Sequence, residues 1–194
     1  MVETTAKEIA RFWLEEIGQE NWYRADDALD AQIRERFLGA WEEAYAGDMY
    51  EWCVNSEAVF GFLILTDQFP RNMFRGEARA FSTDVLARTA AKMAVHRRWD
   101  LEIAEPQRQF FYLPLMHSER MDDQNLAIRL LTDRMPETSP VNLLHARAHR
   151  EVIRRFARFP FRNAALGRMT LPGETEFLEN GGYGAIVREL QAET

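Results

Sequence analysis

Cysteine and lysine are both scarce in this chain of 194 residues. Cys53 is the only cysteine, so an intrachain disulfide and a cysteine-based zinc site are both excluded. Only Lys7 and Lys92 are lysines, so 22 of the 24 basic residues are arginine. Genomic base composition explains such a bias, and so does a use for the planar guanidinium in binding carboxylates or phosphates. Composition alone does not separate these two explanations.

The chain also lacks long apolar runs and an excess of positive charge. Its longest apolar run, residues 58–65, is far shorter than the roughly 20 residues that a membrane-spanning helix needs. The amino-terminal stretch is rich in glutamate and shows no basic segment followed by an apolar block, so it does not resemble a signal peptide. The net charge of −7 argues against a general nucleic-acid binder. We expect a soluble, cytoplasmic protein without a membrane partner, and the sequence does not indicate its oligomeric state.

The common cofactor and nucleophile motifs are missing as well. The chain contains no G-x-G-x-x-G, no G-x-x-x-x-G-K-[ST] and no G-x-S-x-G. We therefore expect no cofactor. Cys53 lies between aromatic and apolar residues, which is typical of an inert packed thiol.

Apolar residues at helical spacing are the main pattern in the sequence. Apolar residues recur at spacings of three and four along residues 9–17 and again along residues 26–48, where Gly47 is expected to end the helix. A third helix opens at Ser56, and Pro70 is expected to disrupt it. Further helical segments are predicted at residues 76–99, 105–114, 122–134, 141–159 and within 170–190.

This pattern predicts an all-α protein of about seven to eight helices. Short connections imply antiparallel helix pairs, either stacked as a solenoid or closed as a bundle. A strict 34-residue tetratricopeptide consensus is absent, and no linker rich in proline or serine divides the chain. We therefore predict a single domain over residues 1–194.

Polar side chains follow the third helix in the segment TDQFPRNMFRG, residues 66–76. Asp67 and Gln68 end an apolar stretch, where an unpaired buried polar group costs roughly 1–3 kcal/mol. They should have partners, and Arg71, Asn72 and Arg75 are the nearest candidates. These residues either lock a helix corner or line a binding site.

A similar segment, RFPFRNAALGR, occupies residues 158–168 and again follows a long helix. It carries Arg158, Arg162, Asn163 and Arg168 around a Phe-Pro step. A cryptic duplication is one explanation. Alternatively, two similar corners face each other and contribute arginine and asparagine to one cleft.

A third segment, FFYLPLMHSE, residues 110–119, places His117 two residues before Glu119. A carboxylate beside an imidazole favours its protonated form and orients the ring, which suits a general acid or base. The structural alternative is that Ser118 or Asp122 caps the next helix while His117 fills an interface.

His145 and His149 form H-x-x-x-H, which places two imidazoles on one helical face. The metalloprotease form of this motif has glutamate directly after the first histidine, but this chain has Ala146 there. Arg147 and Arg150 would also repel a cation. We therefore predict no metal site.

The three segments resemble a bacterial family catalogued as domain of unknown function 924. The family segments look like LDQFPRNxFRG, FFYLPLMHSE and HxxxIxRFGRFPHRNxxLGR, and here they read TDQFPRNMFRG, FFYLPLMHSE and HREVIRRFARFPFRNAALGR. The resemblance runs from about Trp13 to about Gly182 and implies a tetratricopeptide-like all-α fold, without an accepted reaction. The matching polar positions are Asp67, Gln68, Arg71, Asn72, Arg75, His117, Ser118, Glu119, His149, Arg155, Arg158, Arg162, Asn163 and Arg168.

Two positions depart from the family pattern. Phe161 stands where the pattern has histidine, and Ala157 stands where it has glycine. If that histidine were an essential acid or base, this chain would lack the activity. Alternatively, the position serves only packing.

Three functions agree with these observations. The leading hypothesis is a helical binding module whose cleft recognises an anionic small molecule or a peptide carboxylate. The second is a hydrolase or lyase that uses His117 and Glu119 as acid and base. The third is a structural or adaptor protein whose motif residues serve only helix corners. For the binding module, the expected ligand-binding residues are Asp67, Arg71, Asn72, Arg75, His149, Arg158, Arg162 and Asn163.

Overall fold

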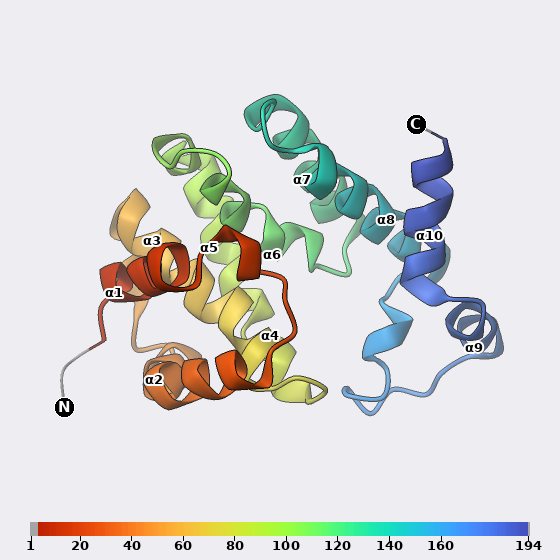
Figure 1. Cartoon of the computed structure of the whole chain (residues 1–194), viewed down its shortest axis with the longest axis horizontal. Coiled ribbons are helices and arrows are strands. Elements are labelled where there is room, and N and C mark those ends of the chain that lie inside the picture. The colour runs from red at the N-terminus through yellow and green to blue at the C-terminus, as the bar shows by residue number, and fades with distance from the viewer. Residues whose placement is uncertain (1–3, 194) are drawn as a thin grey trace. The chain divides into compact units, whose positions relative to one another are not determined.

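The computed structural model describes residues 4–193, and every regular element in that range is a helix (Figure 1). The α-helices are α1 (Ala6–Arg11), α2 (Asp27–Ala46), α3 (Ser56–Leu63), α4 (Phe69–Met73), α5 (Asp84–His96), α6 (Leu113–Met116), α7 (Met121–Arg134), α8 (Pro140–Phe156), α9 (Pro172–Glu179) and α10 (Gly182–Ala192). Short 3-10 helices are η2 (Gln19–Asn21), η3 (Tyr50–Val54), η5 (Ala78–Phe81), η6 (Trp99–Glu102), η7 (Gln107–Phe111) and η8 (Pro160–Arg162). Two π-helical turns are η1 (Phe12–Ile17) and η4 (Ile64–Gln68).

The chain forms two compact units, Met1–Pro114 and Leu115–Thr194. The first unit contains α1 to α5, and the second contains α7 to α10. The short helix α6 begins at the end of the first unit and continues into the second. The expectation of a single domain stays a prediction.

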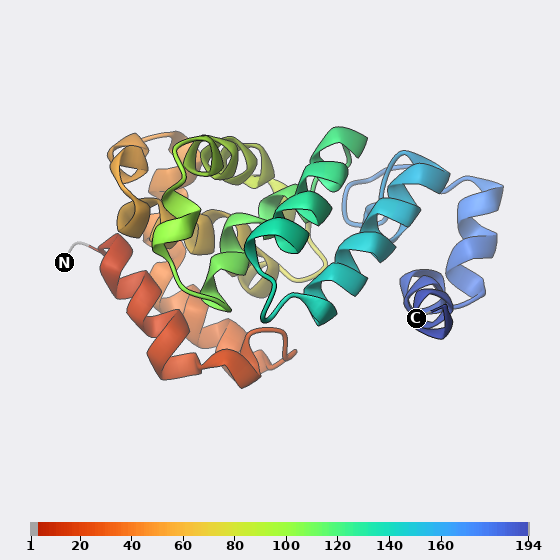
Figure 2. The ribbon, with the colours of Figure 1, turned by 90° about the horizontal axis from the view of Figure 1, so that it is seen from above.

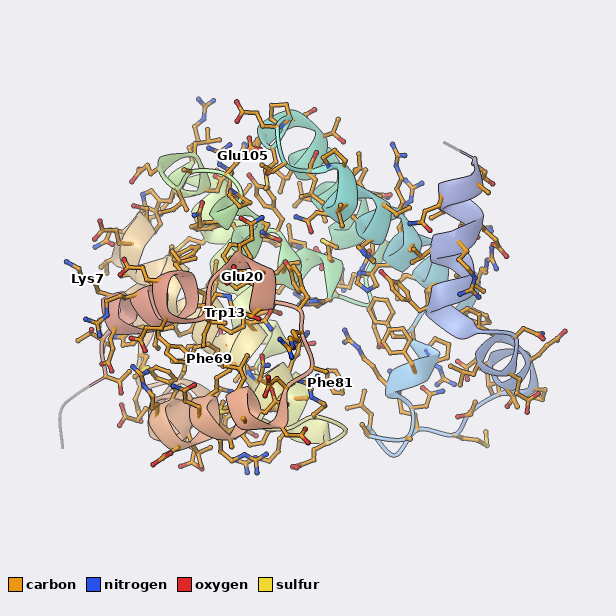
Figure 3. All side chains as sticks on the ribbon, in the orientation of Figure 1. Lys7, Trp13, Glu20, Phe69, Phe81 and Glu105 are labelled. Atoms are coloured by element: carbon orange, nitrogen blue, oxygen red, sulfur yellow. The ribbon has the colours of Figure 1, made fainter. Side chains whose placement is uncertain are left out.

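The core of the first unit is aromatic. Helix α1 packs against α3, α2 packs against α4, and α3 packs against α5. These contacts gather Phe12, Trp13, Phe37 and Phe69, all fully buried. The Trp13 and Phe69 rings lie 5.7 Å apart in an edge-on arrangement, in the interior of this unit (Figure 3). Burial of such rings, at roughly 25 cal/mol per Å² of apolar surface, is the main favourable term for this unit.

Gly61 allows α1 and α3 to approach each other closely. A Cβ atom at this position would lie 2.4 Å from the backbone oxygen of Ala6 and 2.7 Å from its Cα. Both atoms belong to the backbone, so no side-chain rotation relieves the clash. The small residue is therefore a requirement of this helix contact.

The α-helical hydrogen bonding of the third helix gives way to a π turn just before Pro70, so the predicted disruption occurs, but the helix does not end there. The helical path continues from α3 through the π turn η4 into α4, and it ends only at Phe74. Proline normally leaves the carbonyl four residues earlier without a donor. Here the backbone oxygen of Thr66 accepts a hydrogen bond from the Thr83 hydroxyl at 2.6 Å. The π turn and this side-chain donor together accommodate Pro70 inside the helix.

The second unit is built around α8. Helix α8 packs against both α7 and α10, as Figures 1 and 2 show. A short connection joins α7 to α8, as expected for an antiparallel pair. The fully buried side chains of Val152 and Phe159 lie in an apolar cluster with Ile153 and Ile186. The predictions of an all-α fold and of antiparallel helix pairs are confirmed. Within residues 4–193, no helix has the length and apolar character needed to cross a membrane.

Replacing Gly61 with alanine should strongly destabilise the first unit, because the added methyl group forces two backbones apart. Gly39 provides a matched control, since it lies inside α2 and a Cβ atom there meets nothing within 4 Å. Gly39→Ala should stabilise the protein by about 1 kcal/mol, the usual gain from alanine over glycine in a helix. Urea unfolding measures both effects. Equal changes in the free energy of unfolding for Gly61→Ala and Gly39→Ala would contradict the close approach of α1 and α3 at Gly61.

Candidate functional site

Arg71 is the centre of a group of polar side chains in the first unit. One of its terminal nitrogens donates to the backbone oxygen of Asp67 at 2.7 Å. The other donates to Asp84 Oδ1 at 3.0 Å and lies 3.5 Å from Asp67 Oδ1. Burial alone would lower the pKa of Arg71, but the charges of Asp67 and Asp84 raise it overall. The guanidinium is therefore held charged between two carboxylates.

Arg75 and Asn72 converge on a second acid, Asp30 of α2. Arg75 donates to Asp30 Oδ2 at 2.8 Å and to Asp30 Oδ1 at 3.0 Å. Asn72 donates to Asp30 Oδ1 at 2.8 Å and accepts from Gln68 at 3.0 Å. These bonds fasten the end of α4 to the first turns of α2. We call the group Asp30, Asp67, Gln68, Arg71, Asn72, Arg75 and Asp84 the first corner.

The charge of Asp67 also reaches Tyr23. The Tyr23 hydroxyl donates a hydrogen bond to Gln109 Oε1. Tyr23 as a residue is 61% exposed, but protein atoms surround its hydroxyl, and this local desolvation raises the pKa of Tyr23, which the negative charge of Asp67 raises further. Tyr23 therefore stays protonated and acts as a hydrogen-bond donor.

Glu174 is the central acid of a comparable group in the second unit, and it is 2% exposed. Arg158 donates to both of its carboxylate oxygens, at 2.5 and 2.7 Å. The backbone N–H of Leu171 donates to Glu174 Oε2 at 2.8 Å, and Asn163 donates to the same oxygen at 3.1 Å. The bond from Arg158 is the largest cause that lowers the pKa of Glu174 to about 2.

Arg168 links this group to Glu119. It donates to Glu119 Oε2 at 2.8 Å, to Glu119 Oε1 at 3.0 Å and to Asn163 Oδ1 at 3.0 Å. Glu119 Oε1 also accepts from the backbone N–H of Phe159 at 2.8 Å. Burial opposes ionisation of Glu119, but these hydrogen bonds outweigh it and lower its pKa. We call the group Glu119, Arg158, Asn163, Arg168 and Glu174 the second corner.

Histidine and aromatic rings gather beside the second corner. The His149 ring lies 4.9 Å from that of Tyr183, 5.3 Å from that of Phe159 and 6.2 Å from that of His117. His145 Nδ1 forms a 2.7 Å hydrogen bond with the Tyr183 hydroxyl. The two histidines of H-x-x-x-H therefore both contact Tyr183.

Arg162 is buried, and its guanidinium lies 4.4 Å from the centre of the Phe159 ring. This distance is typical of a cation–π interaction. Among residues 4–193, no cluster of three or more histidine, cysteine, aspartate or glutamate side chains has an arrangement that could hold a metal ion.

The structure thus places the predicted site residues in two groups. Asp67, Arg71, Asn72 and Arg75 lie in the first unit. The remaining predicted residues lie in the second unit, namely His117, Glu119, His149, Arg158, Arg162 and Asn163. That all of them line one cleft stays a prediction.

Sequence reasoning missed the acids that hold these arginines. Asp30, Asp84 and Glu174 each accept hydrogen bonds from a motif arginine, but none of them lies in a motif segment. Each lies in the first turn of its helix, which is a common place for acids. No signal in a single sequence separates these three from their neighbours.

The fold and the two corners define an all-α protein in which motif arginines pair with acids of their own unit. The chain belongs to a family described as a bacterial protein of unknown function, DUF924, whose model matches residues 9–182. The resemblance seen in the sequence is thereby confirmed.

A solved structure has the same fold. The protein of unknown function ATU0120 from Agrobacterium tumefaciens is similar, with a TM-score of 0.83 and 38% sequence identity. The match covers 90% of this chain and 97% of the Agrobacterium chain. A comparison with functionally curated proteins gives no match.

The two departures from the family pattern have structural settings. Phe161 is 45% exposed and lies 5.2 Å from the Phe159 ring and 6.3 Å from the Tyr183 ring. Its surroundings are aromatic, which supports a packing role. Ala157 ends α8 with φ 57° and ψ 8°, the left-handed conformation that favours glycine.

Ala157→Gly should therefore stabilise the second unit by about 0.5–1 kcal/mol. The left-handed conformation costs an alanine about 1–2 kcal/mol, and the greater flexibility of unfolded glycine offsets part of the gain. Ala31→Gly, at an exposed position inside α2, is the control and should cost about 1 kcal/mol. Chemical unfolding measures both changes. Destabilisation by Ala157→Gly would contradict the strain at this residue.

The low pKa of Glu174 predicts a pH-dependent stability. The unfolded carboxyl takes up its proton near pH 4.5 and the folded one near pH 2, so the contribution is complete above pH 4.5 and is lost as the pH falls toward 2. Urea unfolding between pH 5 and pH 2 should therefore show a smaller loss of stability in Glu174→Gln than in the wild type. Glu176→Gln, at an exposed position on the same helix, should follow the wild type. Identical profiles for all three proteins would contradict the pairing of Glu174.

Proposed function

We propose that this protein is a non-catalytic helical scaffold in which the two corners brace the helices, while binding takes place on other surfaces. The supporting observation is that the motif arginines are engaged by acids of their own unit. Arg71 contacts Asp67 and Asp84, and Arg158 contacts Glu174. This is the third of the functions that the sequence left open.

Charge pairing explains why these arginines are poor ligand donors. The Asp67 side chain is 3% exposed, and that of Glu174 is also 3% exposed. A ligand anion that took Arg71 or Arg158 would leave one of these buried carboxylates without its cation. Removing one partner of a buried pair costs about 3–5 kcal/mol, which offsets most of what a new ion pair would contribute.

The acid/base hypothesis has less support in the second corner. Glu119 accepts three hydrogen bonds from Arg168 and Phe159, and its pKa is lowered. A carboxylate held ionised in this way is a weak general base, because an effective base has a pKa near the working pH. Glu119 is better suited to fixing the loop that follows α8.

Arg71→Ala tests whether the first corner stabilises the fold. It should destabilise the first unit by about 3–5 kcal/mol, because Asp67 would remain buried without its cation. Arg154→Ala removes an arginine that is 65% exposed and whose partner Glu151 keeps Arg155, so the loss of stability should stay below about 1 kcal/mol. Denaturant unfolding of both variants gives the comparison. An Arg71→Ala variant as stable as the wild type would contradict a stabilising role for the first corner.

A ligand screen is the second test of the proposed scaffold function. A scaffold of this kind should show no thermal stabilisation by inorganic phosphate or succinate that depends on Arg71 or Arg158. Stabilisation of the wild type that disappears in a folded Arg71→Lys variant would instead favour an arginine-lined anion site. The two outcomes separate the scaffold from the binding cleft that the motif segments suggest.

A further inference from the structure

A cavity of about 490 Å³ opens within the second unit, between the first turns of α8 and the last turn of α10. This volume is within the range of small-molecule sites. We call it the α8/α10 cavity. The residues of its lining that matter here are Ser139, Leu143, Leu144, Arg147, Leu190 and Glu193. None of them belongs to either corner.

The floor of the cavity is apolar. Leu143 and Leu144 come from α8, and Leu190 comes from α10. Leu190 packs against the apolar cluster formed by α8 and α10, so the floor continues the core of this unit. All three leucines are only partly buried, so they leave apolar surface that a ligand chain could cover.

Arg147 provides a cation at this floor. It is exposed, and no carboxylate among residues 4–193 forms an ion pair with it, in contrast to Arg154, Arg155 and Arg158 on or near the same helix. Residues 141–168 contain seven arginines and one acid, so the surroundings are positive although the chain as a whole is not. An anion is the natural partner for this guanidinium.

Ser139 supplies a second donor that points to a ligand. It is 6% exposed, it lines the cavity, and its hydroxyl has no hydrogen-bond partner in the part of the chain that the structure describes. It also precedes the first residue of α8, a helix of 17 residues whose positive end attracts anions. A hydroxyl that lines a cavity without an internal partner can donate a hydrogen bond to a ligand there.

The spacing of these donors fits one carboxylate. Side chains on a helix lean toward its N-terminus, so the Arg147 guanidinium would cover the turn that contains Leu143. Ser139 lies one further turn back, about 6 Å along the axis at 1.5 Å per residue. A carboxylate that accepts a hydrogen bond of about 2.8 Å on each side spans such a gap.

From this arrangement we propose that the α8/α10 cavity binds an amphipathic monocarboxylate. Its carboxylate accepts from Arg147 and Ser139, and its apolar chain covers the leucine floor. A single negative charge suits the site better than two, because Glu193 also lines the cavity and would repel a dianion. This proposal goes beyond the scaffold function and does not depend on it.

Octanoate is the probe that tests the cavity, because it combines one carboxylate with an apolar chain. Titration of the full chain with octanoate should show saturable binding by calorimetry. It should also shift the leucine methyl NMR signals of Leu143, Leu144 and Leu190. Acetate has the charge without the chain and 1-octanol has the chain without the charge, so both should bind at least about tenfold more weakly.

Two variants separate the cavity from general charge effects. Arg147→Gln should weaken octanoate binding about tenfold, whereas Arg150→Gln removes the same charge from an exposed position outside the cavity lining and should bind like the wild type. Ser139→Ala should weaken binding without lowering the melting temperature, because the hydroxyl forms no internal hydrogen bond. If Ser139 had only a structural role, Ser139→Ala would lower the melting temperature and leave octanoate binding unchanged.

Three outcomes would overturn the proposal. These are no saturable octanoate binding, equal binding by wild type and Arg147→Gln, or methyl shifts that leave the three leucines unchanged. A failure of this kind would leave the braces at Arg71 and Arg158 unaffected. Conversely, an unchanged stability of Arg71→Ala would say nothing against the cavity, so the two proposals are tested separately.

Discussion

The need to keep buried carboxylates paired determines the arrangement of both corners. Asp67 and Glu174 are each 2% exposed, and an ion loses several kcal/mol of hydration when it is placed in such surroundings. Each therefore needs a cation at fixed geometry, and arginine provides one with directed hydrogen bonds. Asn163 donates a further hydrogen bond to Glu174, whereas Asn72 donates to Asp30, the acid that Arg75 holds in the first corner.

The sequence predicts the helices well, because apolar spacing is a local property that packing reinforces. The ends marked by glycine are also predictable, as at Gly47, whose left-handed φ of 92° closes α2. The continuation through Pro70 could not be predicted, since it depends on the hydroxyl of Thr83, which bonds to the backbone oxygen of Thr66, 17 residues before it in sequence. The same holds for the candidate site. Arginine and asparagine are visible in the motifs, but their partner Asp30 is more than 40 residues from Arg75 and looks like any other acid at a helix start.

The structure also explains part of the excess of arginine over lysine, for which composition alone left two explanations. Some arginines are structural cations, held by acids of their own unit, whereas Arg147 and Arg150 extend from α8 without an ion pair to any described residue. The charge is unevenly divided as well. Residues 1–114 hold 20 acidic and 13 basic residues, and residues 115–194 hold 11 of each. The whole net charge therefore belongs to the first unit, and the neutral second unit offers the less repulsive surface to an anionic ligand.

The π turn at Ile64–Gln68 sets the rotation of α4 about the helix axis. In this turn the backbone N–H of Phe69 bonds to the oxygen of Ile64, five residues earlier, so the turn contains one residue more than an α-helical turn. Each residue of an α-helix advances the chain by about 100°, the angle that 3.6 residues per turn imply. Loss of a single residue here would therefore rotate α4 by roughly that angle and carry Arg71 and Asn72 away from Asp84 and Asp30. The extra residue therefore sets the direction in which Arg71 and Asn72 point. A chain that lacked it would keep the helix but lose the contacts of the first corner.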